Sequence, residues 1–309
     1  MDTVSVIIPY YNRPKKLDRC LASVFAQTYP NVEVIVIDDC SIVPPNRLDT
    51  SIRYHKNETN LGPGPSRNEG IKHASGTYIT FLDCDDYWHP DFIQKTMAQL
   101  KTNSEAVMAY ANGEKVDGEG NTIALRKNRI VLRSSIIPDI LKIGRPWGTG
   151  GCLWVAKEIT DVCWRASFTW EDYAFDIDVG LCNNKIVGIP EVLVFYNSEG
   201  ADKLSHQHVN QEAVRKQPML VYISERLLEH GWVKHPETRK AMQLQLFYQL
   251  ISLQTSGQSS KKLNHELLQA IKAWSTKWKA WYTTAILLLP RHWRLRVLRT
   301  CRKQIKTAR

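Results

Sequence analysis

Short β-branched runs alternate with helix-like segments over the first hundred residues, and this alternation limits the fold more than any other sequence feature. The runs predict strands at 4–9, 32–37, 52–55, 77–82 and 106–111. Apolar residues and turn signals predict helices between them, at 15–27, 66–74 and 90–100. Such alternation is typical of an α/β domain with a largely parallel sheet, so we expect an α/β fold here.

The pattern changes from mixed structure to helices near residue 205. Before that point we expect a hairpin at 116–130, a helix at 134–143, a strand at 152–155, a helix from about 168 to 182 and one or two strands within 185–196. Beyond Asp202 the strand signals stop. The sequence therefore predicts an α/β domain over 1–205 and a helical, basic region over 206–309.

Polar residues follow three of the predicted strands at the points where those strands end. They are Pro9–Asn12, Asp38-Asp39 and Asp83–Asp86. Ligands of open α/β sheets bind outside the carboxyl ends of the strands. We therefore expect these three loops to meet at one edge of the sheet and to form a site.

Three carboxylates, Asp83, Asp85 and Asp86, lie within four positions directly after a buried run. Like charges this close repel by roughly 1 kcal/mol per pair even when partly hydrated. Two acids at i and i+2 can both face one divalent cation or its bound ligand, and this is the first interpretation. The second is a solvated acidic turn that caps the helix beginning near His89-Pro90.

Charge and cysteine content narrow the function classes. Residues 261–309 hold 13 Lys/Arg and one acid, whereas residues 1–260 hold 28 Lys/Arg and 30 acids, so the net charge of +10 belongs to the tail. Seven cysteines without a C-x-x-C pair favour reduced thiols in the cytosol over a disulfide framework or a zinc site. The first residues do not resemble a signal peptide, and no apolar run is long enough for a membrane span. A cytoplasmic protein is expected.

Five blocks in fixed order carry a family resemblance. They are Val-Ile-Ile-Pro-Tyr-Tyr-Asn at 6–12, Val-Ile-Asp-Asp-Cys-Ser at 36–41, Asn60-x-Gly62 with Arg67-Asn68-x-Gly70, Ala-Ser-Gly at 74–76, and Phe-Leu-Asp-Cys-Asp-Asp at 81–86. This order resembles family 2 glycosyltransferases with the GT-A fold. The blocks cover 4–88, and the resemblance extends to about residue 200.

The resemblance implies transfer of a sugar from a nucleotide-diphosphate donor, usually UDP-linked, with Mg²⁺ or Mn²⁺ stabilising the leaving diphosphate. It implies that Asp85 ligates the metal and that Asp83 touches the ribose or a metal-bound water. Asp86 would face the donor sugar or serve structurally.

Other residues of the blocks are implied to hold the nucleotide. Asp38 and Asp39 match an acidic pair that accepts a hydrogen bond from uracil, although either could cap a loop instead. Arg67 is a candidate diphosphate contact, with a solvated helix charge as the alternative. The remaining donor-site assignments are Pro9, Tyr11, Asn12 and Asn60, with simple packing as the alternative for Tyr11.

Glu171-Asp172 matches the acidic pair that the family carries after the metal motif. An inverting transferase needs a general base for the acceptor hydroxyl, and Asp172 is the implied base, with Glu171 positioning the acceptor or its loop. The alternative is acidic residues at a helix N-terminus. Asp176 and Asp178, further along the same helix, are secondary candidates for the base.

Aromatic and histidine residues complete the predicted site. Trp147 and the glycine loop that follows, including Gly150 and Gly151, are assigned to an acceptor subsite, with a core tryptophan as the alternative. His206 and His208 lie where some relatives place a mobile loop, and either could add a third metal ligand or none.

The tail predicts one amphipathic stripe, formed by Trp274, Trp278, Trp281, Ala285 and Leu288 between lysines and arginines. Basic helices with tryptophan on one face lie in membrane interfaces, so we expect attachment to the inner face of the cell membrane. Packing on the body of the protein is the alternative. Nucleic acid is not expected as a partner, because no nucleic-acid motif accompanies the charge.

The combined prediction is a metal-dependent, inverting glycosyltransferase. The expected acceptor is a lipid-linked or polysaccharide hydroxyl in bacterial surface polysaccharide synthesis, such as O-antigen, capsule or lipopolysaccharide core. The competing interpretations are a non-catalytic nucleotide-sugar-binding protein of the same fold and a nucleotidyltransferase. The second would need a basic, glycine-rich phosphate loop, which residues 10–14 do not supply.

Overall fold

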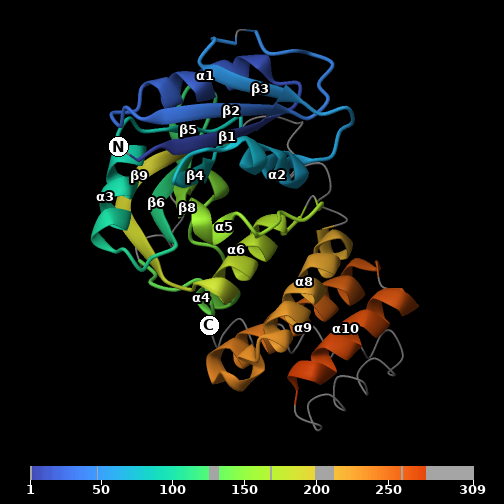
Figure 1. Ribbon diagram of the computed structural model, residues 1–309. Helices are drawn as coiled ribbons and strands as arrows, with labels where there is room; N and C mark the ends of the chain where they lie inside the picture. Colours follow the sequence, from blue (N-terminus) through green and yellow to red (C-terminus); the bar gives the residue numbers. More distant parts are fainter. Residues whose placement is uncertain are drawn as a thin grey trace. The chain divides into compact units, whose positions relative to one another are not determined.

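The computed structural model describes residues 2–46, 48–124, 132–167, 169–198, 212–258 and 260–275. The chain divides into two compact units, Met1–Lys203 and Leu204–Arg309. The predicted boundary at 205/206 falls in the segment 199–211, outside the described residues. Each unit is described by itself (Figure 1).

The first unit is built on one sheet with the strand order β3-β2-β1-β4-β8-β6-β9-β5 in its described part, with β7 beside β6. The strands are β1 (Val4–Tyr10), β2 (Val32–Asp38), β3 (Ile52–Lys56), β4 (Tyr78–Phe81), β5 (Tyr87–Trp88), β6 (Met108–Val116), β7 (Thr122–Ala124), β8 (Cys152–Val155) and β9 (Ile186–Asn197). The helices of this unit are α1 (Pro14–Phe25), α2 (Pro63–His73), α3 (Phe92–Thr102), α4 (Asp139–Ile143), α5 (Ala156–Ile159) and α6 (Glu171–Cys182). The α/β fold class is thereby confirmed.

The prediction of a largely parallel sheet is right for only part of it. Strands β3, β2, β1 and β4 are parallel, but β8 lies antiparallel between β4 and β6. The run Cys152–Val155 is buried, and a short buried run carries no signal of strand direction. The sheet is therefore mixed beyond β4.

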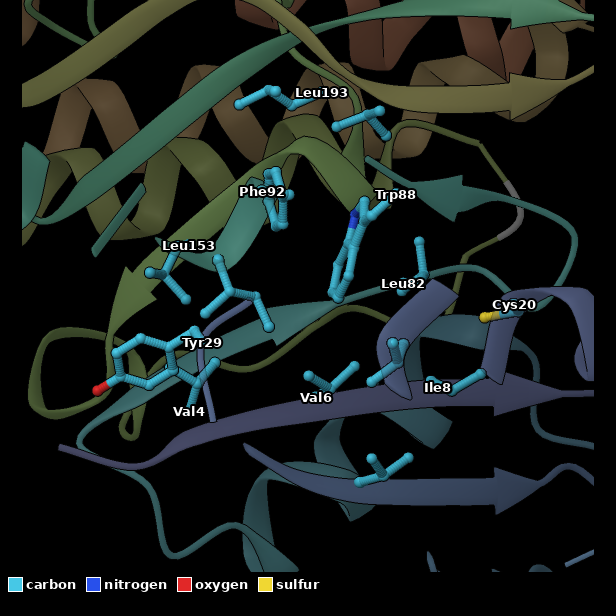
Figure 2. Packing of buried hydrophobic residues seen from close by; sticks show 14 of the residues in the cluster. Val4, Val6, Ile8, Cys20, Tyr29, Leu82, Trp88, Phe92, Leu153 and Leu193 are labelled. Carbon is cyan, nitrogen blue, oxygen red and sulfur yellow. The ribbon is translucent and has the colours of Figure 1, made fainter. Parts of the chain in front are cut away.

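Alternate residues of β1 point to opposite faces of the sheet and bury both of them. Val4, Val6 and Ile8 belong to a core that includes α1 and α3, and Figure 2 shows them on the side of Trp88 and Phe92. On the other face, a Cβ on Gly70 of α2 would come within 2.3 Å of the Ile7 side chain. Helix α2 therefore lies against β1 with no room for a larger residue at position 70.

One helix is shorter than expected. The predicted helix at 134–143 is formed only as α4, from Asp139 onward. Pro138 disfavours helical conformation at the residue before it, so the first half of the segment forms a turn.

The second unit contains α8 (Glu212–Glu229), a short 3₁₀ turn η3 (Trp232–Lys234), α9 (Pro236–Ser256) and α10 (Lys261–Trp274). These helices contact one another in all three pairs and bury apolar residues such as Leu220, Leu246 and Leu267. The prediction of helices beyond Asp202 is confirmed for the described residues. Among the helices of the described residues, none is long and apolar enough to cross a bilayer.

Trp274 corrects the expected membrane-facing stripe. Its side chain is 1% exposed, and its indole nitrogen donates a hydrogen bond to Ser224 Oγ at 2.8 Å. It therefore belongs to the core of the helical unit. The other stripe residues, Trp278, Trp281, Ala285 and Leu288, lie outside the described residues.

Candidate active site

The register of the sheet brings the three polar loops together at one edge, as we expected from their positions at the ends of the strands. Tyr10 of β1 pairs with Asp38 of β2, and Ile7 of β1 pairs with Phe81 of β4. The loops that follow β1, β2 and β4 therefore start from neighbouring positions at one edge of the sheet.

Three residues with left-handed backbone conformation surround this edge. Asn12 (φ 52°) follows β1, Cys40 (φ 63°) follows β2, and Trp170 (φ 65°) precedes α6. Non-glycine residues rarely adopt this conformation, and those that do cluster at functional sites. The surrounding contacts hold the loops in these strained turns.

Asp38 is a structural residue in this arrangement. It has no exposed surface, its Oδ1 accepts a hydrogen bond from Ser41 N at 2.7 Å, and its Oδ2 accepts one from the Tyr54 hydroxyl at 2.5 Å. Burial and the hydrogen bond to Asp38 together raise the pKa of Tyr54. The loop-capping alternative describes these contacts of Asp38, and its uracil contact stays a prediction.

Asp39 holds the loop that leads into α2. Its carboxylate accepts hydrogen bonds from Asn57 Nδ2 at 2.9 Å, Leu61 N at 2.9 Å and Gly62 N at 2.7 Å. Its backbone oxygen accepts one from Asn60 Nδ2 at 3.2 Å. The loop-capping alternative describes these contacts, and a base contact through the 4% of Asp39 that is exposed stays a prediction.

Asn12 fixes the loop after β2. Its Oδ1 accepts hydrogen bonds from Ile42 N and Val43 N, both at 2.8 Å. Pro9 is buried in β1, whereas the Tyr11 side chain is 45% exposed. Of these residues, Tyr11 is the one that offers an open aromatic surface to a ligand.

Arg67 connects the two acidic motifs. Its Nη2 donates to Asp83 Oδ1 at 2.6 Å, and its Nη1 lies 3.8 Å from the Glu171 carboxylate. The guanidinium lies 4.4 Å from the ring centre of Trp164. Its side chain is 3% exposed, so the alternative of a solvated helix charge is wrong.

Part of the Arg67 guanidinium has no hydrogen-bond acceptor. Its Nε and Nη1 are buried, and neither has such a partner among the described residues. Buried donors usually have hydrogen-bond acceptors. These two nitrogens could therefore donate to a ligand bound beside the strand ends.

The other two motif aspartates have separate partners. Asp85 Oδ2 lies 3.2 Å from Arg13 Nη1, and its backbone oxygen accepts a hydrogen bond from Arg19. Asp86 is buried, and its Oδ1 accepts a hydrogen bond from Asn197 N at 3.0 Å. Of the two roles considered for Asp86, the contacts favour the structural one.

Glu171 and Asp172 open helix α6, directly after Trp170. The rings of Trp170 and Tyr173 stack with centroids 4.3 Å apart. The side chain of Asp172 is 27% exposed and that of Glu171 is 16% exposed. Burial, reinforced by the Asp172 carboxylate, raises the pKa of Glu171 to about 7.

Arg145 is a site residue that sequence reasoning missed. Its Nη1 donates to Asp172 Oδ2 at 2.5 Å and its Nε donates to Asp176 Oδ2 at 2.7 Å. Burial raises the pKa of Asp176, while Arg145 and Trp147 stabilise its ionised form. The single arginine in Gly-Arg-Pro-Trp-Gly had no periodic or motif signal that could point to these partners.

Trp147 is a core residue, which corrects its assignment to an acceptor subsite. It is 1% exposed, and its indole nitrogen donates to Asp176 Oδ2 at 2.7 Å. Gly150 and Gly151 are also buried, and the Gly150 carbonyl accepts a hydrogen bond from Trp88 Nε1 at 2.6 Å. A buried ring has no face free to stack on a sugar. His206 and His208 lie outside the described residues.

Several known proteins are similar to this chain in sequence. A glycosyltransferase of Haemophilus influenzae, named as uncharacterized, is 37% identical over 132 residues, which are 40% of this chain and 52% of that protein. The putative teichuronic acid biosynthesis glycosyltransferase TuaG of Bacillus subtilis is 35% identical over 108 residues, 33% of this chain and 43% of its own. The chain thus matches about half or less of these relatives' length.

Solved structures and the family model agree with these relatives. TarS of S. aureus (residues 1–349), solved in complex with UDP-GlcNAc, superposes with a TM-score of 0.65 at 18% identity over 88% of this chain and 80% of TarS. That likeness shows the fold, and the predicted GT-A architecture is confirmed. The family model described as "Glycosyl transferase family 2" matches residues 5–164. Because that match covers more than half of the sequence, the chain belongs to glycosyl transferase family 2.

Proposed function

We propose that this chain transfers a sugar from a nucleotide-diphosphate donor, preferably a UDP-sugar, to an acceptor hydroxyl with inversion at the sugar carbon. One observation carries the proposal: Arg67 joins Asp83 of the strand-end motif to Glu171 of the helix α6 pair. A donor diphosphate and an acceptor hydroxyl must lie within a few ångströms of each other for transfer. Arg67 shows that the two acidic motifs are that close.

The donor side uses Arg67, Asp83 and Tyr11. The Nε and Nη1 groups of Arg67, which have no hydrogen-bond acceptor among the described residues, are suited to phosphate oxygens, which guanidinium binds in forked geometry. Tyr11 offers its exposed ring to a base. TarS, which shares the fold, has been solved with UDP-GlcNAc and with UDP, and this supports a uridine nucleotide here.

The strand-end carboxylates fit a hard divalent cation, Mn²⁺ or Mg²⁺. Asp83 lies 2.6 Å from Arg67 and Asp85 lies 3.2 Å from Arg13, and two carboxylates that attract positive charge support a cation at this position. No three acidic, histidine or cysteine side chains of the described residues converge as a complete metal site. A cation held by Asp85, with Asp83 beside it, would take other ligands from diphosphate oxygens and water. It would supply Lewis-acid stabilisation of the charge on the leaving diphosphate.

Asp172 is the proposed general base. It is more exposed than Glu171, and each of its two oxygens accepts one hydrogen bond, from Arg145 and from Tyr173 N. A carboxylate has further acceptor sites, so Asp172 can take the proton of the acceptor hydroxyl as that oxygen bonds to the sugar carbon. The bond to diphosphate breaks on the opposite face. Glu171, whose pKa burial raises to about 7, is partly protonated near neutral pH, and we assign it to positioning the acceptor.

The acceptor proposed is a lipid-linked or polysaccharide hydroxyl in surface-polysaccharide synthesis. The support is the relative TuaG, named for teichuronic acid biosynthesis. The basic residues of the tail, 13 Lys/Arg in 261–309, further support attachment to the inner face of the membrane through anionic lipids.

Calorimetry on Asp85→Ala tests the donor site. In the unaltered chain, Mn²⁺ should increase the affinity for UDP. In the variant, Mn²⁺ should leave the affinity for UDP unchanged, because the variant lacks the proposed metal ligand. Asp91→Ala removes a nearby exposed carboxylate paired with His89 and serves as the matched control. Unchanged Mn²⁺–UDP affinity in Asp85→Ala would overturn the metal assignment.

A further inference from the structure

Arg145 is buried between two carboxylates of helix α6, with a side chain that is 6% exposed. Toward Asp176 it makes a forked contact, from Nε at 2.7 Å and from Nη2 at 3.4 Å. Toward Asp172 it directs Nη1 at 2.5 Å. One guanidinium thus holds two acids that lie one helical turn apart.

The Asp176 end of this arrangement is rigid. Asp176 has no exposed surface, and Trp147 Nε1 donates to the same oxygen that Arg145 Nε contacts. The arginine backbone is held too, because Arg145 N donates to the Tyr173 hydroxyl at 3.1 Å. The guanidinium therefore has little freedom to move.

The Asp172 end is the one that faces solvent, since its side chain is 27% exposed whereas that of Asp176 is fully buried. An arginine keeps its proton under all relevant conditions, so Arg145 cannot itself take the acceptor's proton. It can fix the rotamer of Asp172 and keep one carboxylate oxygen occupied. The other oxygen is then directed by Tyr173 N, at 2.8 Å.

We infer that Arg145, anchored by Asp176 and Trp147, is a positioning residue that aims the Asp172 carboxylate at the acceptor hydroxyl. This inference rests on the proposed function, in which Asp172 is the base. Asp176, in the second turn of α6, anchors Arg145 and is not an alternative base. Trp147 acts through the same chain of contacts.

The inference predicts a loss in the chemical step without a loss of donor binding. Among the described residues, the hydrogen bonds and ion pairs of Arg145 are to Asp172, Asp176 and Tyr173, and none is to Asp83 or Asp85. Misplacing a catalytic group by about 1 Å costs roughly 100-fold in rate. Replacing Arg145 should therefore lower kcat and leave the donor KM and Mn²⁺–UDP affinity unchanged.

Arg145→Lys is the main test, because it keeps a cation beside buried Asp176 but lacks the fork needed to serve both carboxylates. We expect kcat for transfer to fall between about 10-fold and 100-fold, with an unchanged donor KM. In an Asp172→Asn background the same substitution should not lower kcat further, because the carboxylate that Arg145 positions is gone. Guanidinium ion added to Arg145→Ala should restore part of the lost rate.

Arg165→Lys is the matched control, since Arg165 pairs at 3.8 Å with Asp178 on the same helix. A normal kcat in Arg145→Lys would overturn the inference, and so would a loss that is equally large in the Asp172→Asn background. A loss confined to donor affinity would also overturn it. Full transfer by Asp172→Asn alone would instead overturn the proposed base, which separates the two failures.

Discussion

At the scale of single residues, the site is organised by arginines placed between acids. Arg13 meets Asp85, Arg67 meets Asp83 and Glu171, and Arg145 meets Asp172. Arg67 and Arg145 are buried, and a buried charge requires a partner because an unpaired charge in the interior is costly. These arginines therefore set the positions of the acids before any donor is bound.

Glu171 gives a stability prediction whose sign follows from its pKa. Burial raises that pKa from 4.5 in the unfolded chain to about 7. Between these values the folded protein binds more protons than the unfolded chain, so this residue makes stability fall as pH rises from about 4.5 to 7. Glu171→Gln should remove that fall and increase the free energy of unfolding at pH 8 by on the order of 1–3 kcal/mol.

Denaturant unfolding at pH 5 and pH 8 measures this effect. Glu69→Gln is the control, because a hydrogen bond from Lys72 lowers the pKa of Glu69 below its usual 4.5. The effect of Glu69 on stability therefore changes only at more acidic pH, and this variant should keep the pH dependence of the unaltered chain between pH 5 and pH 8. An identical pH dependence in Glu171→Gln and the unaltered chain would show that Glu171 is ionised at neutral pH.

The sequence predicted the acids of the site better than the partners of those acids. Carboxylates after a buried strand are visible as a local pattern, and Asp83, Asp85 and Asp172 all lie at the ends of elements, as expected. Arg145 was missed because its partners are 27 and 31 residues away and only folding brings them together. Trp147 was placed in an acceptor subsite because an aromatic residue beside glycines looks the same in a loop and in a core.

At the scale of elements, the residues that form strands and helices could be predicted, but not all their directions or lengths. Hydrophobic periodicity placed β1, β2 and β8 to within a residue or two, since those runs are buried. The antiparallel direction of β8 depends on pairing with β4 and β6, which no local pattern encodes. The two-residue β5 is too short to leave a signal.

Helix α10 determines where a membrane test must cut the chain. Leu267, Ile271 and Trp274 are buried in the helical unit, so a cut after residue 260 would remove part of its core. A chain ending at Ser275 keeps α10 and removes the basic residues 276–309. We expect it to fold and to lose co-sedimentation with anionic vesicles, because electrostatic attraction falls by about 1 kcal/mol per basic residue removed.

Trp274→Ala is the comparison for that experiment. It should destabilise the helical unit by about 3–5 kcal/mol while keeping the basic tail. Equal vesicle binding by the chain ending at Ser275 and by the full chain would contradict the membrane proposal.

At the scale of the whole molecule, the site is assembled from two stretches of the α/β unit. The family match ends at residue 164, whereas Glu171 and Asp172 come after it. Arg67, on α2 within the matched stretch, bridges the two parts by contacting Asp83 and Glu171. We propose that these two stretches form one centre, with donor binding on the first and proton removal on the second.

The decisive variant is Asp172→Asn, with transfer from a UDP-sugar and Mn²⁺–UDP affinity measured on the same preparation. Asparagine keeps the size of the side chain and removes its ability to take a proton. We expect transfer to fall by roughly 10²- to 10⁴-fold with unchanged Mn²⁺–UDP affinity, while Asp178→Asn on the same helix retains transfer. Full transfer by Asp172→Asn would show that proton removal does not depend on this carboxylate and that the two stretches do not form one catalytic centre.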